Sequence, residues 1–199
     1  MSEQRRESAS ILNDAITAGD TETVTSLIDR GIGVNEPDSF GQLPMFVAVR
    51  DGKADIVQLL IERGVDVNTP LDRHGRRPLY CAADHGQLNI VEYLIANGAT
   101  IDALESHGQS ALWVSALTLA NESLNVTNPA SWRSTQNRNP TGRVAVTERL
   151  IAAGADVDLS PKDSDSPADF IRSAGVPRLI ALLGERKKHS FWPRLFGRG

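Results

Sequence analysis

The feature that most constrains the fold of this chain is a pattern that returns about every 33 residues, a period typical of repeat proteins. Leucine, isoleucine, two variable residues and glycine occur together four times, ending at Gly31, Gly64, Gly98 and Gly154. The first two steps between these glycines are equal to within one position, and the third is longer by about 23 residues, which is less than one further repeat. In repeat proteins, each unit is one small supersecondary structure. We therefore interpret the chain as a stack of similar units with one interruption.

Two further series follow the same period and predict what each unit looks like. They are Gly41, Gly75 and Gly108, and then Pro44, Pro78, Ala111 and Pro167. A proline is favoured in the first turn of a helix, where its missing N–H costs nothing. Each unit is therefore expected to hold a first helix that begins at this position. A second helix follows and ends at the glycine of the first pattern, which suits the left-handed C′ position.

Two stretches carry a resemblance to a known family. GQLPMFVAVRDGKADIVQLLIERGVDVN and GRRPLYCAADHGQLNIVEYLIANGATID resemble the ankyrin repeat. The resemblance covers roughly residues 10–183 and implies an all-α solenoid of about five helix-turn-helix units with hairpin-like fingers. Stacking would make the core continuous, because no unit buries its apolar face alone. It also implies a non-enzymatic protein that binds another protein.

Two motif positions depart from the family pattern. The usual threonine is replaced by Leu43, Arg77 and Ser110, and the usual histidine by Phe46, Tyr80 and Trp113. We expect non-polar packing to replace the hydrogen bonds that threonine and histidine make in the family. The three aromatic residues either form a ladder in a groove or pack in the core. In the core, the tyrosine O–H and the indole N–H need hydrogen-bond partners.

The domain organisation follows from the repeat. We expect an N-terminal tail over 1–9, one repeat domain over 10–183 and a basic, aromatic tail over 184–199. An insertion at about 118–141 is expected between the two helices of repeat four, with the first helix continuing to about Leu124. Within the insertion, Trp132 and Arg133 are either an anchor for a partner or a contact that pins the loop to the stack.

The resemblance implies a binding face made of the concave surface, the fingertips and the ends of the first helices. Phe40 and Leu117 are apolar where solvent is expected, and Arg73, Arg76 and Arg77 suggest a local basic cluster. An ordinary solvated surface is the alternative for each residue. The fingertip candidates are Phe40, Gln42, Arg73, His74, Arg76, His107 and Gln109, the helix-end candidates are Arg50, Asp84, His85 and Leu117, and the insertion adds Trp132 and Arg133.

Motifs for catalysis, cofactors and metals are not expected to be present. The sequence shows no phosphate-binding glycine loop and no nucleophile elbow. Cys81 falls inside a predicted helix without an assigned base. His74, His85 and His107 are not spaced to complete a tetrahedral metal site with cysteine or aspartate. We therefore expect a non-enzyme with no cofactor and no bound metal.

Charge and composition bound the partner and the compartment. Residues 186–199 carry five lysines and arginines and no acid, which leaves residues 1–185 with a net charge of −9. That sign argues against nucleic-acid binding through the main fold. The tail suits a weak contact with an anionic membrane, an acidic partner or a docked position on the stack. One cysteine and no expected signal peptide or spanning helix favour a cytoplasmic monomer. It would serve as a scaffold or adaptor, as an inhibitor of one partner enzyme, or as a peripheral membrane adaptor.

Overall fold

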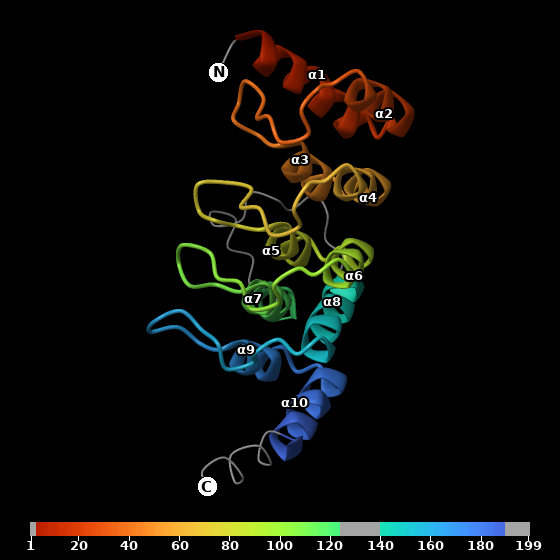
Figure 1. The fold of residues 1–199 in the computed structure, drawn as a ribbon. Helices are drawn as coiled ribbons and strands as arrows, with labels where there is room; N and C mark the ends of the chain where they lie inside the picture. Colours follow the sequence, from red (N-terminus) through yellow and green to blue (C-terminus); the bar gives the residue numbers. More distant parts are fainter. Residues whose placement is uncertain (1–2, 124–139, 190–199) are drawn as a thin grey trace, which may run out of the picture.

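The computed structural model describes residues 3–123 and 140–189, in which the chain forms ten helices and no strand. Five consecutive helix pairs stack in chain order, and a long connection between each pair and the next projects to one side (Figure 1). The fold is therefore an all-α repeat solenoid. The pairs are α1 (Glu3–Ala18) with α2 (Thr21–Asp29), α3 (Pro44–Arg50) with α4 (Ala54–Glu62), α5 (Pro78–Asp84) with α6 (Leu88–Ala96), α7 (Ala111–Ser123) with α8 (Pro140–Ala152), and α9 (Pro167–Ala174) with α10 (Pro177–His189).

The helix ends follow the sequence signals. Pro44 and Pro78 are the first residues of α3 and α5, and an extended residue precedes each of them. After α4, Gly64 has φ +89°, a conformation that is strained for any residue with a Cβ. The N–H of Gly64 donates to Ile61 O at 3.0 Å, and the N–H of Val65 donates to Leu60 O at 3.0 Å. These two bonds form a Schellman cap, so the prediction of a C′ glycine is confirmed.

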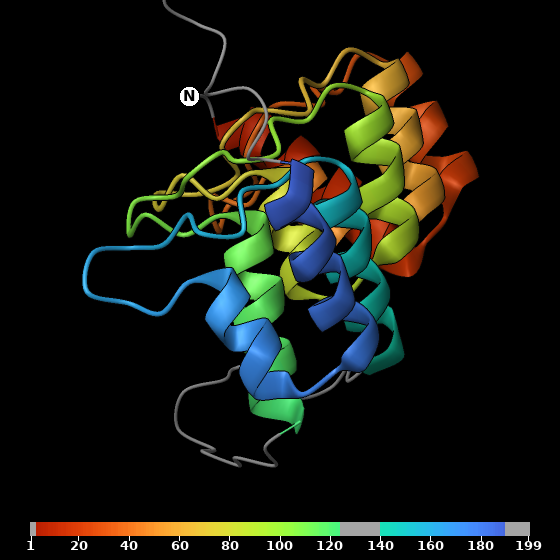
Figure 2. The ribbon, with the colours of Figure 1, turned by 90° about the horizontal axis from the view of Figure 1, so that it is seen from below.

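The core runs through the whole stack. The odd-numbered helices form one layer and the even-numbered helices form the other, as seen from below in Figure 2. Small residues allow neighbouring odd-numbered helices to approach, since Ala48, Ala82 and Ser115 are fully buried. Leu60 and Leu94, on α4 and α6, are also fully buried. Each pair therefore covers the apolar face of the next, as the repeat pattern predicts.

The two ends of the domain differ from the expected boundaries. Helix α1 begins at Glu3, so residues 3–9 are helical and not a tail. Ala9 is completely buried, and Arg5 forms an ion pair with Glu36 at 3.5 Å. Residues 3–9 hold no proline or glycine of the repeat series, so the sequence pattern does not mark where this helix begins. At the other end, α10 continues through residue 184 to His189.

The fourth pair is longer than the pair before it. Helices α7 and α8 have 13 residues each, whereas α5 has seven and α6 has nine. The expected continuation of the first helix to about Leu124 is confirmed, because α7 ends at Ser123. Leu119 and Ala120 in this extension are buried, and Ser115 Oγ lies 2.8 Å from Thr147 Oγ1 between α7 and α8. Residues 124–139, with Trp132 and Arg133, lie outside the described residues.

None of the helices in the part of the chain that the structure describes is long and apolar enough to span a membrane.

Candidate protein-binding face

Four connections between helix pairs form the fingers of the stack. We call residues 30–43 finger one, 63–77 finger two, 97–110 finger three and 153–166 finger four. The tips of the first three fingers close in the same way. A glycine N–H donates to the carbonyl oxygen of an acidic residue three positions earlier. These pairs are Gly41 with Asp38, Gly75 with Asp72 and Gly108 with Glu105, at 3.0, 3.0 and 2.9 Å.

The acidic side chains hold these tips rigid. In each tip, one carboxylate oxygen accepts two backbone N–H groups, from the residues two and four positions later, at 2.8 to 3.2 Å. The backbone N–H groups of each turn therefore find their hydrogen-bond acceptor within the same finger. Sequence analysis missed these three carboxylates. The signal was available, because Asp38, Asp72 and Glu105 each lie three positions before a glycine of the second repeat series and so share its spacing.

The second carboxylate oxygen has a different partner in each finger. Asp38 accepts from the side-chain amide of buried Asn13 at 2.9 Å, so finger one is tied to α1. Asp72 accepts from the Arg76 guanidinium at 2.5 Å. Burial acts to raise the pKa of Asp72, but the hydrogen bonds from Arg76 and His74 outweigh it and lower that pKa below its ordinary value.

Glu105 repeats this arrangement with a histidine. Its second oxygen lies 2.8 Å from Nδ1 of His107, and the Glu105 side chain is almost fully buried. Burial acts to raise the pKa of Glu105, but the bonds from His107 and from the Gln109 N–H outweigh it, and the net effect lowers the pKa. Ionised Glu105 is therefore part of the folded finger at neutral pH.

The lowered pKa of Glu105 predicts a pH-dependent contribution to stability. A carboxyl whose pKa is lower in the folded state stabilises that state above its unfolded pKa, and this contribution is lost as pH falls through the folded pKa. Glu105→Gln should therefore lower the free energy of unfolding by about 1 kcal/mol at pH 7, and the difference from wild type should shrink below about pH 4.5. Urea unfolding at a series of pH values measures this. Exposed Glu92 on α6 gives the control Glu92→Gln, and a Glu105→Gln difference that does not change with pH would contradict the prediction.

The side chains at the tips are presented outward. Phe40 at the tip of finger one is 86% exposed. His74 and His107 occupy the same position in fingers two and three, and their ring centroids are 5.5 Å apart. The Ser106 N–H donates to His74 O at 2.7 Å, and Arg73 Nε donates to His74 Nε2 at 3.3 Å. The structure thus brings three predicted residues together, namely Arg73, His74 and His107.

The predicted basic cluster is more tightly held than the sequence suggests. Arg73 is exposed, but Arg76 is paired with Asp72. The Arg77 guanidinium donates to Asn68 O at 3.0 Å and to Leu104 O at 3.3 Å, so it joins finger two to finger three. Of the three arginines in this cluster, Arg76 and Arg77 therefore make hydrogen bonds within the fingers, whereas Arg73 is exposed. The guanidinium groups of Arg76 and Arg77 both donate to acceptors that belong to fingers two and three.

The replacements at the usual threonine position behave in two ways. Leu43 packs against the core, as expected. Arg77 makes the bonds just described, and Ser110 Oγ accepts the N–H of Trp113 at 3.1 Å at the start of α7. Non-polar packing was therefore the wrong expectation for Arg77 and Ser110. A serine before a helix caps the first turn in this way.

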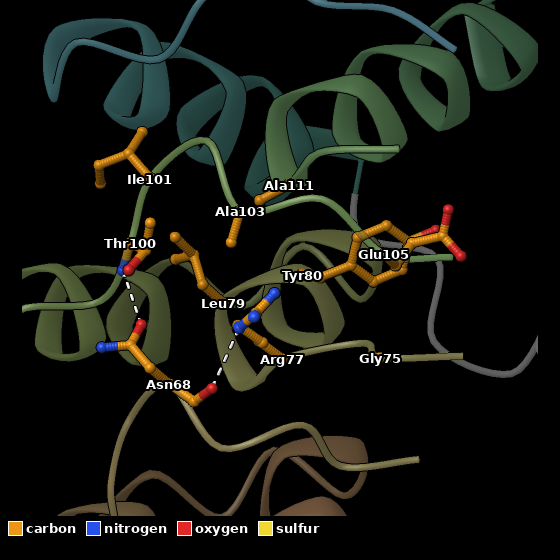
Figure 3. A pocket seen from close by; sticks show the side chains of 10 residues that line it. All are labelled: Asn68, Gly75, Arg77, Leu79, Tyr80, Thr100, Ile101, Ala103, Glu105 and Ala111. Carbon is orange, nitrogen blue, oxygen red and sulfur yellow. Dashed lines mark hydrogen bonds between the residues drawn. The ribbon is translucent and has the colours of Figure 1, made fainter. Parts of the chain in front are cut away.

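A small cavity lies beside Arg77, between fingers two and three. Its volume is about 10 Å³, and Asn68, Tyr80, Thr100 and Glu105 are among the residues around it (Figure 3). Asn68 Oδ1 accepts the N–H of Thr100 at 2.8 Å along this edge. A space of this size suits one water molecule and is far below the roughly 300–1,000 Å³ of a small-molecule site. The cavity therefore belongs to the packing of the fingers.

The three aromatic residues at the usual histidine position are mostly packed against the stack. Tyr80 and Trp113 are 9% and 7% exposed, and Phe46 is half-buried. The Tyr80 hydroxyl donates to Gln109 Oε1 at 2.8 Å, and Trp113 Nε1 donates to Asp165 O at 3.0 Å. Burial raises the pKa of Tyr80, so its hydroxyl stays protonated. The core alternative describes Tyr80 and Trp113, and the expected polar partners are confirmed.

The candidate residues at the ends of the odd-numbered helices include charged, polar and apolar side chains. Arg50 pairs with Asp51 at 2.7 Å and donates to Gln42 Oε1 at 3.2 Å, which links α3 to finger one. His85 Nδ1 lies 2.7 Å from the Cys81 carbonyl oxygen. Leu117 is half-buried against the core. Arg50 and His85 therefore make hydrogen bonds within the stack, and Leu117 packs part of its apolar surface there.

Arg143 on α8 is a buried charged residue that sequence analysis missed. It is only 6% exposed, and its guanidinium donates to the carbonyl oxygen of Asp84 at the end of α5. A cation at a helix C-terminus is favoured by the helix dipole. Arg143 follows Gln87 by the same number of residues as Leu150 follows Leu94, so Arg143 and Gln87 occupy equivalent positions in their repeats. Gln87 lies beside Gly52, at the end of α3, and Arg143 lies in the same way beside the end of α5.

The structure gives little scope for nucleophilic or metal chemistry in the described part. Cys81 is buried, and burial raises the pKa of its thiol to about 12. It is therefore protonated at neutral pH and a poor nucleophile. Within residues 3–123 and 140–189, no group of three or more histidine, cysteine, aspartate or glutamate side chains is placed to hold a metal ion.

Comparison with known proteins agrees with this geometry. A search of curated proteins found no match. A family model described as ankyrin repeats (3 copies) matches residues 12–105. That segment runs from α1 to the tip of finger three, and repeats of this family are generally non-enzymatic modules for protein–protein interaction. Residues 12–105 of this chain are therefore similar to three ankyrin repeats.

Proposed function

We propose that this protein is a non-enzymatic module that binds one partner protein through its fingertips and the concave face beside them. The observation that carries this proposal is Phe40, a large apolar side chain that is 86% exposed on a turn held by the Asp38 carboxylate. A rigid aromatic side chain loses little conformational entropy on binding, and aromatic residues dominate the energy of protein interfaces.

The same proposal extends the repeats beyond residue 105. Helices α7 to α10 would form two more units, which gives five in all and places the insertion of about 118–141 within the fourth. Three features support this. Pro167 begins α9, the N–H of Ala155 after Gly154 donates to Leu150 O at 3.1 Å as in the cap of α4, and Ser164 N–H donates to Pro161 O at 3.3 Å at the tip of finger four.

The concave face adds polar contacts to the apolar anchor. Arg50, Asp84 and His85 stand at the ends of α3 and α5 and keep part of their surface exposed. A mixture of charges around an aromatic anchor suits a specific partner more than general adhesion. Trp132, Arg133 and residues 190–199 lie outside the described residues, so inhibition of an enzyme by the insertion and membrane contact by the tail do not enter this proposal. We propose a cytoplasmic monomer as the working form.

Photocrosslinking at Phe40 tests the binding face. A photoreactive phenylalanine at position 40 should capture the partner, whereas the same group at exposed Gln58 on α4, in the other helix layer, should not. With the captured protein purified, Phe40→Ser should weaken its binding by about 10- to 100-fold in calorimetry, as expected for an aromatic anchor. Gln58→Ser is the matched control. Equal capture at both positions, or an unchanged Kd for Phe40→Ser, would overturn the proposal.

A further inference from the structure

Two imidazole rings meet at the tips of fingers two and three. The His74 and His107 centroids are 5.5 Å apart with the ring planes tilted by 31°. The fingers are also joined by the bond from Ser106 N–H to His74 O at 2.7 Å. The two rings are therefore held side by side by backbone contacts and by the carboxylate-held turns beneath them, independently of any ligand.

The hydrogen bonds at the tip use the neutral form of His74. Its Nε2 accepts from Arg73 Nε at 3.3 Å, which requires a free lone pair on that nitrogen. A proton on Nε2 removes this acceptor and places a second positive charge beside Arg73. The Arg73 side chain, which is already exposed, is then released toward solvent. Protonation of one ring thus makes two cationic groups available to a partner.

The surrounding charges decide what such a partner looks like. Fingertips two and three, residues 72–77 and 105–109, hold three arginines and two carboxylates, so their net charge is +1 with neutral histidines and +3 with both protonated. Both carboxylates are largely turned inward, onto backbone N–H groups. The whole chain carries −4, so this positive patch is local. It attracts a short acidic segment more than a long polyanion, which the rest of the body repels.

The neighbouring elements carry charges of both signs around this patch. On finger one, the Asp38 carboxylate is buried and bonded to Asn13. On finger three, Glu105 is paired with His107. Finger four approaches at Pro161, whose Cα lies 3.5 Å from the position of a Cβ on Gly108. It carries one exposed cation, Lys162, and four exposed acids, of which Asp163 and Asp165 follow Pro161 and Asp156 and Asp158 precede it. Asp84 lies at the far end of α5, away from the tips.

We infer that fingertips two and three bind an acidic segment of the partner protein, and that this binding strengthens when His74 and His107 take up protons. This inference rests on the proposed function, because it assigns chemistry to part of the same face. The apolar contact at Phe40 would lie beside the acidic contact, one finger away.

A ten-residue oligo-aspartate peptide labelled with fluorescein tests the inference, because its carboxylates stay ionised well below pH 6. Fluorescence anisotropy with the full chain should show about tenfold tighter binding at pH 5.5 than at pH 7.5, and 0.5 M NaCl should remove the gain. The His74→Gln/His107→Gln variant should bind equally at both pH values. His74→Gln alone, which keeps the Glu105–His107 bond, should lose about half of the gain on a logarithmic scale.

The controls separate this site from charge effects elsewhere on the chain. Gln58→His, which adds an imidazole at an exposed position of α4 in the other helix layer, should keep the wild-type pH response. The inference is overturned if the double variant keeps the wild-type pH response, if oligo-aspartate fails to bind at either pH, or if a ten-nucleotide oligo-dT binds more tightly than oligo-aspartate. If Phe40→Ser still weakens the captured partner in any of these cases, the proposed function stands and only the acidic site fails.

Discussion

Leu60→Ala is expected to lower the free energy of unfolding by about 2–5 kcal/mol. Leu60 on α4 is completely buried in the core shared by neighbouring helix pairs. Alanine would remove two methyl carbons and the methine carbon that bears them, and would leave a cavity that the rigid stack cannot close fully. Because each unit is stabilised by its neighbours, the loss should be felt on both sides of the second pair. Urea unfolding followed by circular dichroism at 222 nm measures the effect.

The matched control for Leu60 is Gln58 on the same helix. Gln58 is exposed, so Gln58→Ala should change the free energy of unfolding by no more than about 0.5 kcal/mol. A loss below about 0.5 kcal/mol for Leu60→Ala would contradict the burial of this side chain between helix pairs.

Trp113→Ala is expected to cost about 3–5 kcal/mol and to loosen the last helix pair first. The indole is buried, meets the Phe170 ring edge-on at a centroid distance of 5.6 Å, and donates to Asp165 O. It therefore connects α7 to both finger four and α9. Loss of this connection should separate the unfolding of α9 and α10 from that of the preceding pairs. Hydrogen exchange of the α9 amides, compared with those of α5, detects this separation.

Trp113→Phe distinguishes packing from hydrogen bonding at this position. It keeps an aromatic ring near Phe170 but leaves Asp165 O without its indole donor, so we expect a smaller loss of about 1–2 kcal/mol. If Trp113→Ala costs no more than Trp113→Phe, or if α9 and α5 exchange together in both variants, Trp113 does not hold the last pair to the stack.

The repeat period predicted most of the fold because each signal acts locally. A proline at the first helical position and a glycine after the last turn mark the ends of α3 and α4 within one residue. The extension of α7 was also visible, since the apolar spacing continues past Leu117 to Leu124. The start of α1 was not predicted, because no proline or glycine of the repeat series marks the beginning of this helix.

The chemistry of the fingertips was less accessible to sequence reasoning. Arg76 and Arg77 look like free charges in the sequence, but their partners are a partly buried carboxylate and two backbone carbonyl groups that only the folded turns bring within reach. The 5.5 Å distance between the ring centroids of His74 and His107 depends in the same way on how finger two packs against finger three. The repeat period places these residues one repeat apart but does not predict the orientation of their side chains.

The carboxylates beneath the fingertips have a consequence for how this chain can change its target. Asp38, Asp72 and Glu105 satisfy the donors of their own turns. The outward residue of each tip can thus be replaced without asking the neighbouring helices to adjust. The sequence of one fingertip can then be exchanged while the others are kept. New specificity could be built by grafting a single five-residue loop, while the solenoid that carries it stays the same.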